Sequence, residues 1–308
     1  MNEISIYPIE LNALLELTIG EFNIIANYRP NSSRTGVWKV QSKRDNILYF
    51  LKTYTRKQRW HPEVYAYQNW MHHLHPYVPK LIEIYEDKDW QAILISSMDG
   101  TIMREVALDD NQVYKAYFMA GHLTKKIHSL CTGKWYGRPD KDGAPIELNH
   151  HLDPVTYIHN SMEETYTKCS QSNLLDQDEI MLVKWALENT SVFTDSLPVP
   201  VGWDSTPGNW LVNSDGNLVG MIDFENMLWG IDVESFSILF ERYFNESENA
   251  KRAFFEGYGI EILVKKQIHI RITCIRLALS NIWWGTHNNA LKVEEYGRNL
   301  MKQMREKL

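Results

Sequence analysis

The chain has 308 residues and a mass of 36.1 kDa, and its net charge is −7 at neutral pH. Hydrophobic residues make up 44% of the sequence and charged residues 23%, which excludes a wholly disordered or fibrous protein. The acidic balance argues against a nucleic-acid partner, and no apolar run is long enough to span a membrane. The three cysteines form no CxxC pair and the N-terminal segment lacks a signal-peptide pattern. We therefore expect a cytoplasmic protein from a reducing compartment.

The first hundred residues have the pattern of a small antiparallel sheet. Short segments rich in β-branched and aromatic residues alternate with polar turns, and one segment with helical apolar spacing begins at a proline. The expected order is three strands, a helix and two strands, at residues 22–28, 36–40, 47–53, 62–74, 81–85 and 91–97. We expect residues 1–98 to form a sheet-rich lobe that ends in a hinge near residues 96–101.

The rest of the chain has the pattern of a larger helical lobe, which we place at residues 99–308. Apolar residues at helical spacing predict helices over residues 111–130, 176–192, 261–284 and 289–307. An Asp-Gly turn predicts a single β-hairpin over residues 210–222. Residues 139–154 show the least pattern and are expected to form a loop over a cleft. The predicted fold class is therefore α+β, with two lobes.

The most informative block of sequence runs from residue 201 to residue 225. Asp204 lies on a loop, Asn209 lies where the predicted hairpin begins, and Asp223 lies where it ends. Because a hairpin brings its two ends together, Asn209 and Asp223 are expected to face each other. Their hard oxygen ligands suit Mg²⁺, which binds one or two carboxylates together with phosphate oxygens. Asp204 would lie beside that ion, where a carboxylate can accept the proton of an attacking hydroxyl.

This block resembles a known family. The spacing D-x-x-x-x-N from Asp204 to Asn209, followed by I-D-F at Ile222–Phe224, is similar to the aminoglycoside phosphotransferase and choline kinase-like families, which share the protein-kinase fold. The resemblance implies a two-lobed kinase fold that transfers the γ-phosphoryl group of ATP or GTP to a small-molecule hydroxyl. It also implies that Asp204 is the catalytic base and that Asn209 and Asp223 hold Mg²⁺.

The same resemblance extends to the predicted sheet lobe. Lys52 matches the lysine on the third strand that contacts the nucleotide phosphates, and Glu63 matches its ion-pair partner on the following helix. The loop between the first two strands would cradle phosphate through backbone N–H groups and hydroxyls. By this comparison the remaining nucleotide-binding candidates are Ser32, Ser33, Thr35 and Gly36 in the loop, and Ser96 and Met98 in the hinge.

The sequence departs from the family pattern at three places. Gly202 stands where the family usually has a histidine two residues before the catalytic aspartate, and Thr206 replaces a second histidine. The phosphate loop retains one glycine, Gly36. The acidic residue of a later Gly-Asp-Pro phrase has no clean match. These departures keep open a second hypothesis, in which the chain is a pseudokinase that binds nucleotide without turnover.

An acidic segment follows the metal-binding aspartate. Residues 223–248 contain seven acids and one base, which is consistent either with an ordinary acidic helix face or with a pocket for a cationic acceptor. The second reading predicts an aminoglycoside, another amine-bearing antibiotic, or choline, and makes the enzyme a resistance enzyme or a metabolite kinase. Glu225, Asp232 and Glu234 are its candidate acceptor-binding residues.

Histidines and tryptophans supply the remaining candidates. No histidine spacing matches a closed zinc site, but His150, His151 or Asp153 could line the acceptor cleft. The tryptophans are expected in the core, with one or two available to stack on a ligand; those considered are Trp203, Trp210, Trp229, Trp283 and Trp284. The sequence leaves the oligomeric state open between a monomer and a homodimer.

Overall fold

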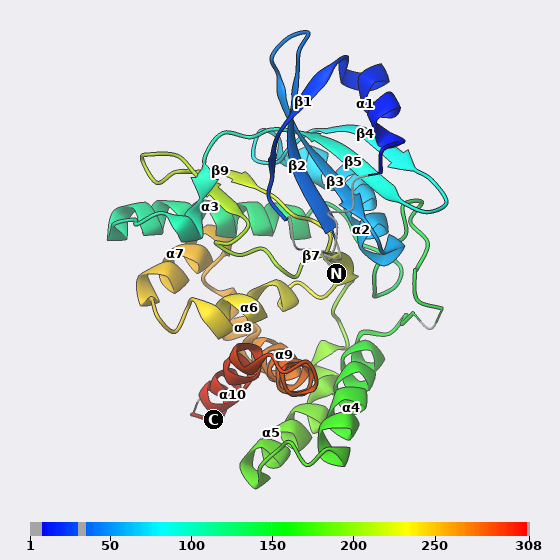
Figure 1. Ribbon diagram of the computed structural model, residues 1–308. Helices are drawn as coiled ribbons and strands as arrows, with labels where there is room; N and C mark the ends of the chain where they lie inside the picture. The colour runs from blue at the N-terminus through cyan, green and yellow to red at the C-terminus, as the bar shows by residue number, and fades with distance from the viewer. Residues whose placement is uncertain (1–7, 30–34, 149, 307–308) are drawn as a thin grey trace.

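The computed structural model describes residues 8–29, 35–148 and 150–306 and joins an N-terminal sheet region to a C-terminal helical region (Figure 1). A 3-10 turn at Met71–Leu74 follows the second helix. In chain order the sheet region contains α1 (Leu11–Ile19), β1 (Phe22–Asn27), β2 (Thr35–Ser42), β3 (Leu48–Tyr54), α2 (Lys57–Asn69), β4 (Leu81–Glu86) and β5 (Gln91–Ser96).

The five strands form one antiparallel sheet in the order β1-β2-β3-β5-β4. β3 is the central strand, and Leu51 on it pairs with Trp38 of β2 and with Leu94 of β5. Because successive side chains on a strand point to opposite faces, Leu51 lies in the apolar cluster under α1, whereas Lys52 reaches Glu63 of α2 on the other face. The alternation along β3 thus places its lysine on the face that looks toward the helical region.

The helical region packs below the sheet. Its helices are α3 (Asp110–His128), α4 (Pro154–Gln171), α5 (Gln177–Glu188), α6 (Glu234–Arg242), α7 (Glu248–Tyr258), α8 (Ile262–Lys265), α9 (Gln267–His287) and α10 (Leu291–Glu306). Two small sheets lie next to the cleft: β6 (Thr101–Ile102) with β8 (Trp210–Val212) and β9 (Leu218–Met221), and β7 (Val199–Gly202) with β10 (Met227–Gly230). Among the helices that the structure describes, none is long and apolar enough to cross a membrane.

Local sequence signals explain where several helices begin. The Asp109 carboxylate accepts a 2.8 Å bond from the backbone N–H of Gln112, whose side chain bonds back to Asp109, and this capping box starts α3. Asp153 caps α4 by accepting a 2.7 Å bond from the backbone N–H of Thr156, and Pro154 stands in the first turn, where its missing N–H has no cost. The loop predicted over residues 139–154 is thus followed directly by a helix that was not predicted.

Helices α3 and α7 cross at unusually close range through two glycines. A Cβ atom on Gly121 would lie 2.0 Å from the Phe254 carbonyl oxygen, and one on Gly257 would lie 2.0 Å from the Phe118 carbonyl oxygen. Any larger residue at either position would push the two helices apart. This crossing fixes α3, whose last turn lies beside the loop that carries Asp204.

One apolar core runs through both regions. Trp70, which follows α2, lies edge-on to Trp229 of β10, with ring centroids 4.8 Å apart. Tyr67 of α2 lies edge-on to Phe224, with centroids 5.3 Å apart. Both pairs belong to the same buried cluster as the large-lobe residues around α3, α6 and α9. The helix that carries Glu63 is therefore packed against the helical region as well as against the sheet.

The structure corrects several expected elements. The second helix begins at Lys57, five residues earlier than expected, so Pro62 lies inside it and residues 71–74 form a separate 3-10 turn. Helices α1, α4, α6 and α7 and strands β7 and β10 were not predicted. For α6 the reason is physical, because Glu234 and Glu241 were interpreted as part of a binding wall, whereas both side chains are buried within the fold.

Candidate active site

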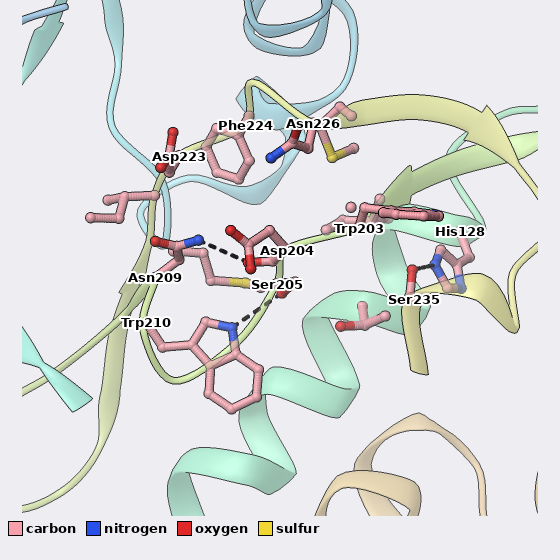
Figure 2. A pocket seen from close by; sticks show the side chains of 16 residues that line it. His128, Trp203, Asp204, Ser205, Asn209, Trp210, Asp223, Phe224, Asn226 and Ser235 are labelled. Carbon is pink, nitrogen blue, oxygen red and sulfur yellow. Dashed lines mark hydrogen bonds between the residues drawn. The ribbon is translucent and has the colours of Figure 1, made fainter. Parts of the chain in front are cut away.

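The β8–β9 hairpin brings Asn209 and Asp223 to the same place. The backbone N–H of Ile222 donates a 3.0 Å bond to the carbonyl oxygen of Asn209, which closes the mouth of the hairpin. The Asn209 side chain donates a 2.9 Å bond from Nδ2 to the backbone carbonyl oxygen of Asp204. This bond uses the amide nitrogen and leaves the amide oxygen as the ligand atom. Figure 2 shows Asp204, Asn209 and Asp223 around one pocket.

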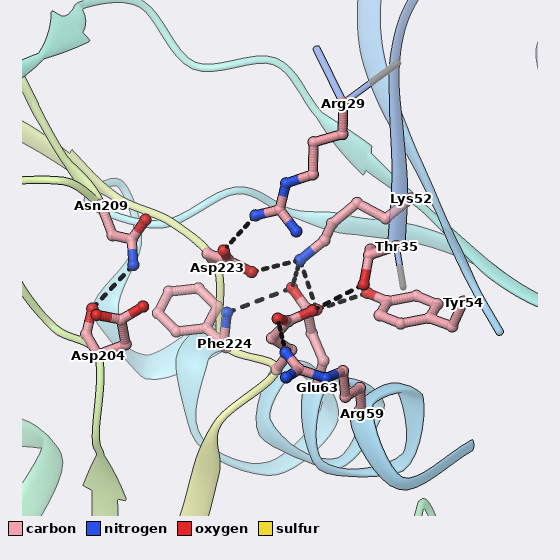
Figure 3. Close-up of polar contacts among 11 residues, drawn as sticks. Arg29, Thr35, Lys52, Tyr54, Arg59, Glu63, Asp204, Asn209, Asp223 and Phe224 are labelled. Atoms are coloured by element: carbon pink, nitrogen blue, oxygen red, sulfur yellow. Dashed lines mark hydrogen bonds and ion pairs between the residues drawn. The ribbon is translucent and has the colours of Figure 1, made fainter. Parts of the chain in front are cut away.

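Asp223 has a left-handed backbone conformation, with φ +67°, which aspartate tolerates better than most residues. Its carboxylate accepts a 2.8 Å bond from Lys52 Nζ and a 2.8 Å bond from Arg29 Nη2 (Figure 3). Burial alone would raise its pKa, but these two cations outweigh burial and hold the pKa at about 2. Asp223 is therefore fully ionised at neutral pH.

Lys52 is buried and forms a second ion pair on the other side. Its Nζ lies 2.7 and 2.6 Å from the two carboxylate oxygens of Glu63, which also accepts a bond from the Tyr54 hydroxyl. Burial opposes the charged form, yet the carboxylates of Asp223 and Glu63 raise the pKa of Lys52 above its usual range. The lysine that sequence reasoning singled out is thus a permanent cation between α2 and the Asp223 segment.

A fourth ion pair completes this network. Arg59, one turn before Glu63 on α2, is ion-paired with Glu225, which also accepts a 3.2 Å bond from the Thr35 hydroxyl. Carboxylate oxygens of Glu63, Asp223 and Glu225 lie within 4.8 Å of one another. In the described part of the chain these three acids face three cations, Lys52, Arg29 and Arg59. The network supplies hard oxygen ligands of the kind that Mg²⁺ binds.

Asp204 lies next to Asp223 in a water-poor setting. Burial is the main cause that raises the pKa of its carboxyl group, and the nearby Asp223 charge raises it further. A carboxylate whose pKa moves toward the working pH is a better proton acceptor. The loop is held by a 3.1 Å bond from Trp210 Nε1 to Ser205 Oγ. Gly202, which replaces the family histidine, lies in β7 opposite Met227, so strand pairing supports this position.

The predicted nucleotide-binding residues fall on different structural positions. Thr35 and Gly36 begin β2, and a Cβ on Gly36 would lie 1.9 Å from the Trp38 ring, so only glycine fits there. Ser96 ends β5 and accepts a 2.9 Å bond from the Lys80 backbone N–H, while Met98 lies against Gly220 of the hairpin. Ser32 and Ser33 lie outside the described residues.

The three acids expected to bind a cationic acceptor do not form an open wall. Glu225 lies in the network below β3, as described above. Asp232 is paired with Lys266 at 2.6 Å, and Glu234 is paired with Arg276 and accepts a 3.1 Å bond from the Tyr157 hydroxyl. Each acid is thus matched by a cation. The negative charges of these three acids are therefore neutralised by ion pairs within the fold and are not free to bind a cationic ligand.

A second cavity adjoins the catalytic pocket and contains two of the expected histidines. Its volume is about 380 Å³, and it shares Trp203 and Asn226 with the pocket around Asp204. His150 and His151 line it, whereas Asp153 caps α4. Sequence reasoning missed Arg29 and Arg59, whose partners lie 194 and 166 residues away along the chain. No spacing rule reports such pairs.

Comparisons with known proteins agree with this geometry. Residues 28–266 match the model of the phosphotransferase enzyme family. The chain belongs to this family. No curated protein is similar enough in sequence to match it.

Solved structures show the fold of this phosphotransferase family member. A ternary complex of a thermostable mutant of aminoglycoside phosphotransferase APH(4)-Ia with AMP-PNP and hygromycin B matches with a TM-score of 0.71, 11% identity and coverage of 96% of this chain and 98% of that one. The GDP complex of aminoglycoside 2'-phosphotransferase-IIIa matches with a TM-score of 0.65, 13% identity and 96% coverage of both chains. The predicted two-lobed, protein-kinase-like α+β fold is thus confirmed.

Proposed function

We propose that this chain is a Mg²⁺-dependent small-molecule phosphotransferase that moves the γ-phosphoryl group of ATP or GTP to an acceptor hydroxyl. The observation that carries the proposal is the contact of Lys52 with both Glu63 and Asp223, at 2.6 to 2.8 Å. It brings the phosphate-binding lysine and the metal-binding aspartate into one network. Phosphoryl transfer depends on such positioning and charge neutralisation more than on covalent chemistry.

The residues take distinct roles in this mechanism. Asp204 accepts the proton of the acceptor hydroxyl and orients its oxygen for in-line attack. Lys52 stabilises the nucleotide phosphates, and Glu63 keeps the lysine pointed at them. Asn209 and Asp223 would hold Mg²⁺, and the ionised state of Asp223 fits that role. When bound, Mg²⁺ neutralises phosphate charge.

Nucleotide binding is the first test of this proposal. Thermal unfolding would be followed with ATP and with GTP, each with and without Mg²⁺, since AMP-PNP and GDP in the similar structures support both donors. A nucleotide present at about 100 Kd stabilises the native state by about 2.7 kcal/mol. We expect a Mg²⁺-dependent rise in Tm that is lost in Asp223→Ala. The absence of any rise with either nucleotide would contradict the proposal.

Turnover separates this proposal from the pseudokinase hypothesis. The retained Asp204, Asn209 and Asp223 support an active enzyme, and β7–β10 pairing supports the loop despite Gly202. We expect basal nucleotide hydrolysis or transfer that disappears in Asp204→Asn while the nucleotide-dependent Tm rise remains. A Tm rise without any turnover would instead favour the pseudokinase.

A further inference from the structure

The side chains that line the cavity beside the pocket around Asp204 indicate which kind of acceptor fits it. Half of its lining residues carry rings, and one ion pair is its only charged feature among the described residues. The lining consists of Tyr136, Gly137, Arg138, Glu147, His150, His151, Tyr157, Trp203, Asn226 and Leu228. Small-molecule sites are commonly apolar and aromatic with a few placed polar groups. This cavity follows that description rather than that of an acidic trough.

The one carboxylate in this lining is already neutralised. Glu147 Oε1 accepts bonds of 3.0 and 2.7 Å from Arg138, and Glu147 Oε2 is buried with no partner among the described residues, which leaves one acceptor for a donor such as a ligand hydroxyl. A compound with several ammonium groups needs several carboxylates to replace its lost water. The lining offers a neutral pair instead, and the acids of the neighbouring segment are matched by Lys266, Arg276 and Arg59.

The aromatic walls are also backed by a fixed cation. The Arg276 guanidinium lies 5.3 Å from the ring centroid of Tyr157 and 5.9 Å from that of Trp203. A cation over an aromatic ring uses the electrostatic attraction of that ring. Arg276 thus already forms cation–π contacts with these two rings, so they are less able to bind the ammonium group of a ligand.

Trp203 favours a ligand that carries a hydrogen-bond acceptor. Its indole N–H is buried and has no partner among the residues that the structure describes, and the side chain lines the pocket around Asp204, the acceptor cavity and a small enclosed cavity beside Ser237. A buried unpaired donor costs about 1 to 3 kcal/mol, so a bound group that accepts its hydrogen bond is favoured. A hydroxyl, ether or carbonyl oxygen can accept that bond, whereas an ammonium group has no lone pair to do so.

We infer that the acceptor of this enzyme is an uncharged, hydroxylated ring compound, such as a glycoside or a nucleoside, rather than a polycation. The inference rests on the proposed function, because it assigns the cavity next to Asp204 as the acceptor site. One face of the ring lies on the aromatic wall, an oxygen accepts the Trp203 N–H bond, and a hydroxyl is presented to Asp204.

The first experiment compares acceptors of the two kinds with the full-length enzyme. Transfer to a panel of nucleosides and methyl glycosides would be measured beside transfer to kanamycin, with titration calorimetry on the same compounds. We expect at least one uncharged compound to exceed kanamycin in kcat/KM by about tenfold or more. Equal or better use of kanamycin, or no binding by any uncharged compound, would overturn the inference.

Two variants test the residues that carry the inference. Trp203→Phe keeps the ring and removes the donor, so we expect acceptor KM to rise about tenfold while Tm is unchanged or higher. A fall in Tm would show that the donor already has a structural partner and would overturn its assigned role. Arg138→Gln frees Glu147, so we expect it to raise kanamycin kcat/KM several-fold, whereas Arg252→Gln on α7, far from the cavity lining, has no such effect. Equal effects of both glutamine variants would contradict the charge argument.

Nucleotide measurements keep the two proposals separate. The Mg²⁺-dependent Tm rise depends on Lys52 and Asp223, and basal nucleotide hydrolysis depends on Asp204 as well; neither depends on the aromatic cavity. Their absence would refute the proposed function itself. Their presence together with a preference for kanamycin would refute only the acceptor class.

Discussion

Removing Arg59 is the perturbation that tests the ion network most directly. Glu225 is 5% exposed, and its partners in the structure are Arg59 and the Thr35 hydroxyl. Arg59→Met would leave the Glu225 charge buried beside Glu63 and Asp223 without its cation. Breaking a buried pair from one side typically costs about 3 to 5 kcal/mol. Because the Arg59 side chain is itself 26% exposed, water can replace part of the loss, and we expect about 2 to 3 kcal/mol.

Replacing Glu225, the partner of Arg59, should destabilise the protein less than Arg59→Met. The two single variants and the double variant together measure the coupling free energy of the pair. In Glu225→Gln the arginine can turn toward solvent, so we expect about 1 kcal/mol of destabilisation. The double variant removes both charges and should resemble the milder single variant rather than the sum. Such a cycle gives a coupling free energy of about 2 to 3 kcal/mol, within the range for contacting residues.

Urea unfolding followed by tryptophan fluorescence would supply the four free energies of unfolding. Arg252→Met is the matched control, because Arg252 lies on the surface of α7 and its side chain is 60% exposed. We expect that control to stay within about 0.5 kcal/mol of the wild type. Additivity of the two single variants within about 0.5 kcal/mol would refute the claim that the pair stabilises the segment that carries Asp223.

Three further predictions concern the reaction, the helix crossing and pH. Asp204→Asn should lower kcat by about 10² to 10⁴-fold with nucleotide affinity nearly unchanged, which steady-state kinetics and calorimetry would check; near-normal turnover would remove Asp204 as the base. Gly121→Ala should destabilise the protein by about 1 to 3 kcal/mol, because its methyl group would collide with the Phe254 carbonyl oxygen; an unchanged urea midpoint would contradict this close approach. Burial lowers the pKa of His128 to about 4. As the pH falls, the imidazole is therefore protonated in the unfolded chain before it is protonated in the folded protein. The free energy of unfolding should fall by up to about 3 kcal/mol between pH 6.5 and pH 4. Unfolding midpoints measured across that pH window should fall in the wild type and fall less in His128→Asn. An equal pH dependence of the two proteins would show that another group causes the acid sensitivity.

Short-range signals in the sequence predicted a substantial part of this molecule. Alternation and turn residues located the five strands of the sheet to within about two residues, because strand period and turn chemistry are local properties. The hairpin argument predicted that Asn209 and Asp223 would meet, and the backbone bond from Ile222 N–H to the Asn209 carbonyl oxygen brings the two segments together one residue before Asp223. Lys52 and Glu63 were predicted by resemblance and order, and the structure joins them in an ion pair.

Long-range charge pairing could not be predicted in this way. The acidic segment looked like a binding wall because its partner cations lie far along the chain: Lys266 and Arg276 follow it, and Arg59 precedes it by more than 160 residues. Net charge over a window does not reveal such partners. The same difficulty affected α6, where Glu234 is paired with Arg276 of α9, whereas the two acids of α7 are paired within their own helix with Lys251 and Arg252.

The aromatic contacts between α2 and β10 also bear on how the protein can be divided. Trp70 is 1% exposed because Trp229 covers it. A fragment ending at residue 98 would expose this ring and its neighbours to water, and the remaining fragment would lose the other half of the same contact. We therefore expect that the sheet lobe does not fold on its own, that either fragment expressed alone is insoluble, and that co-expression restores a heterodimer.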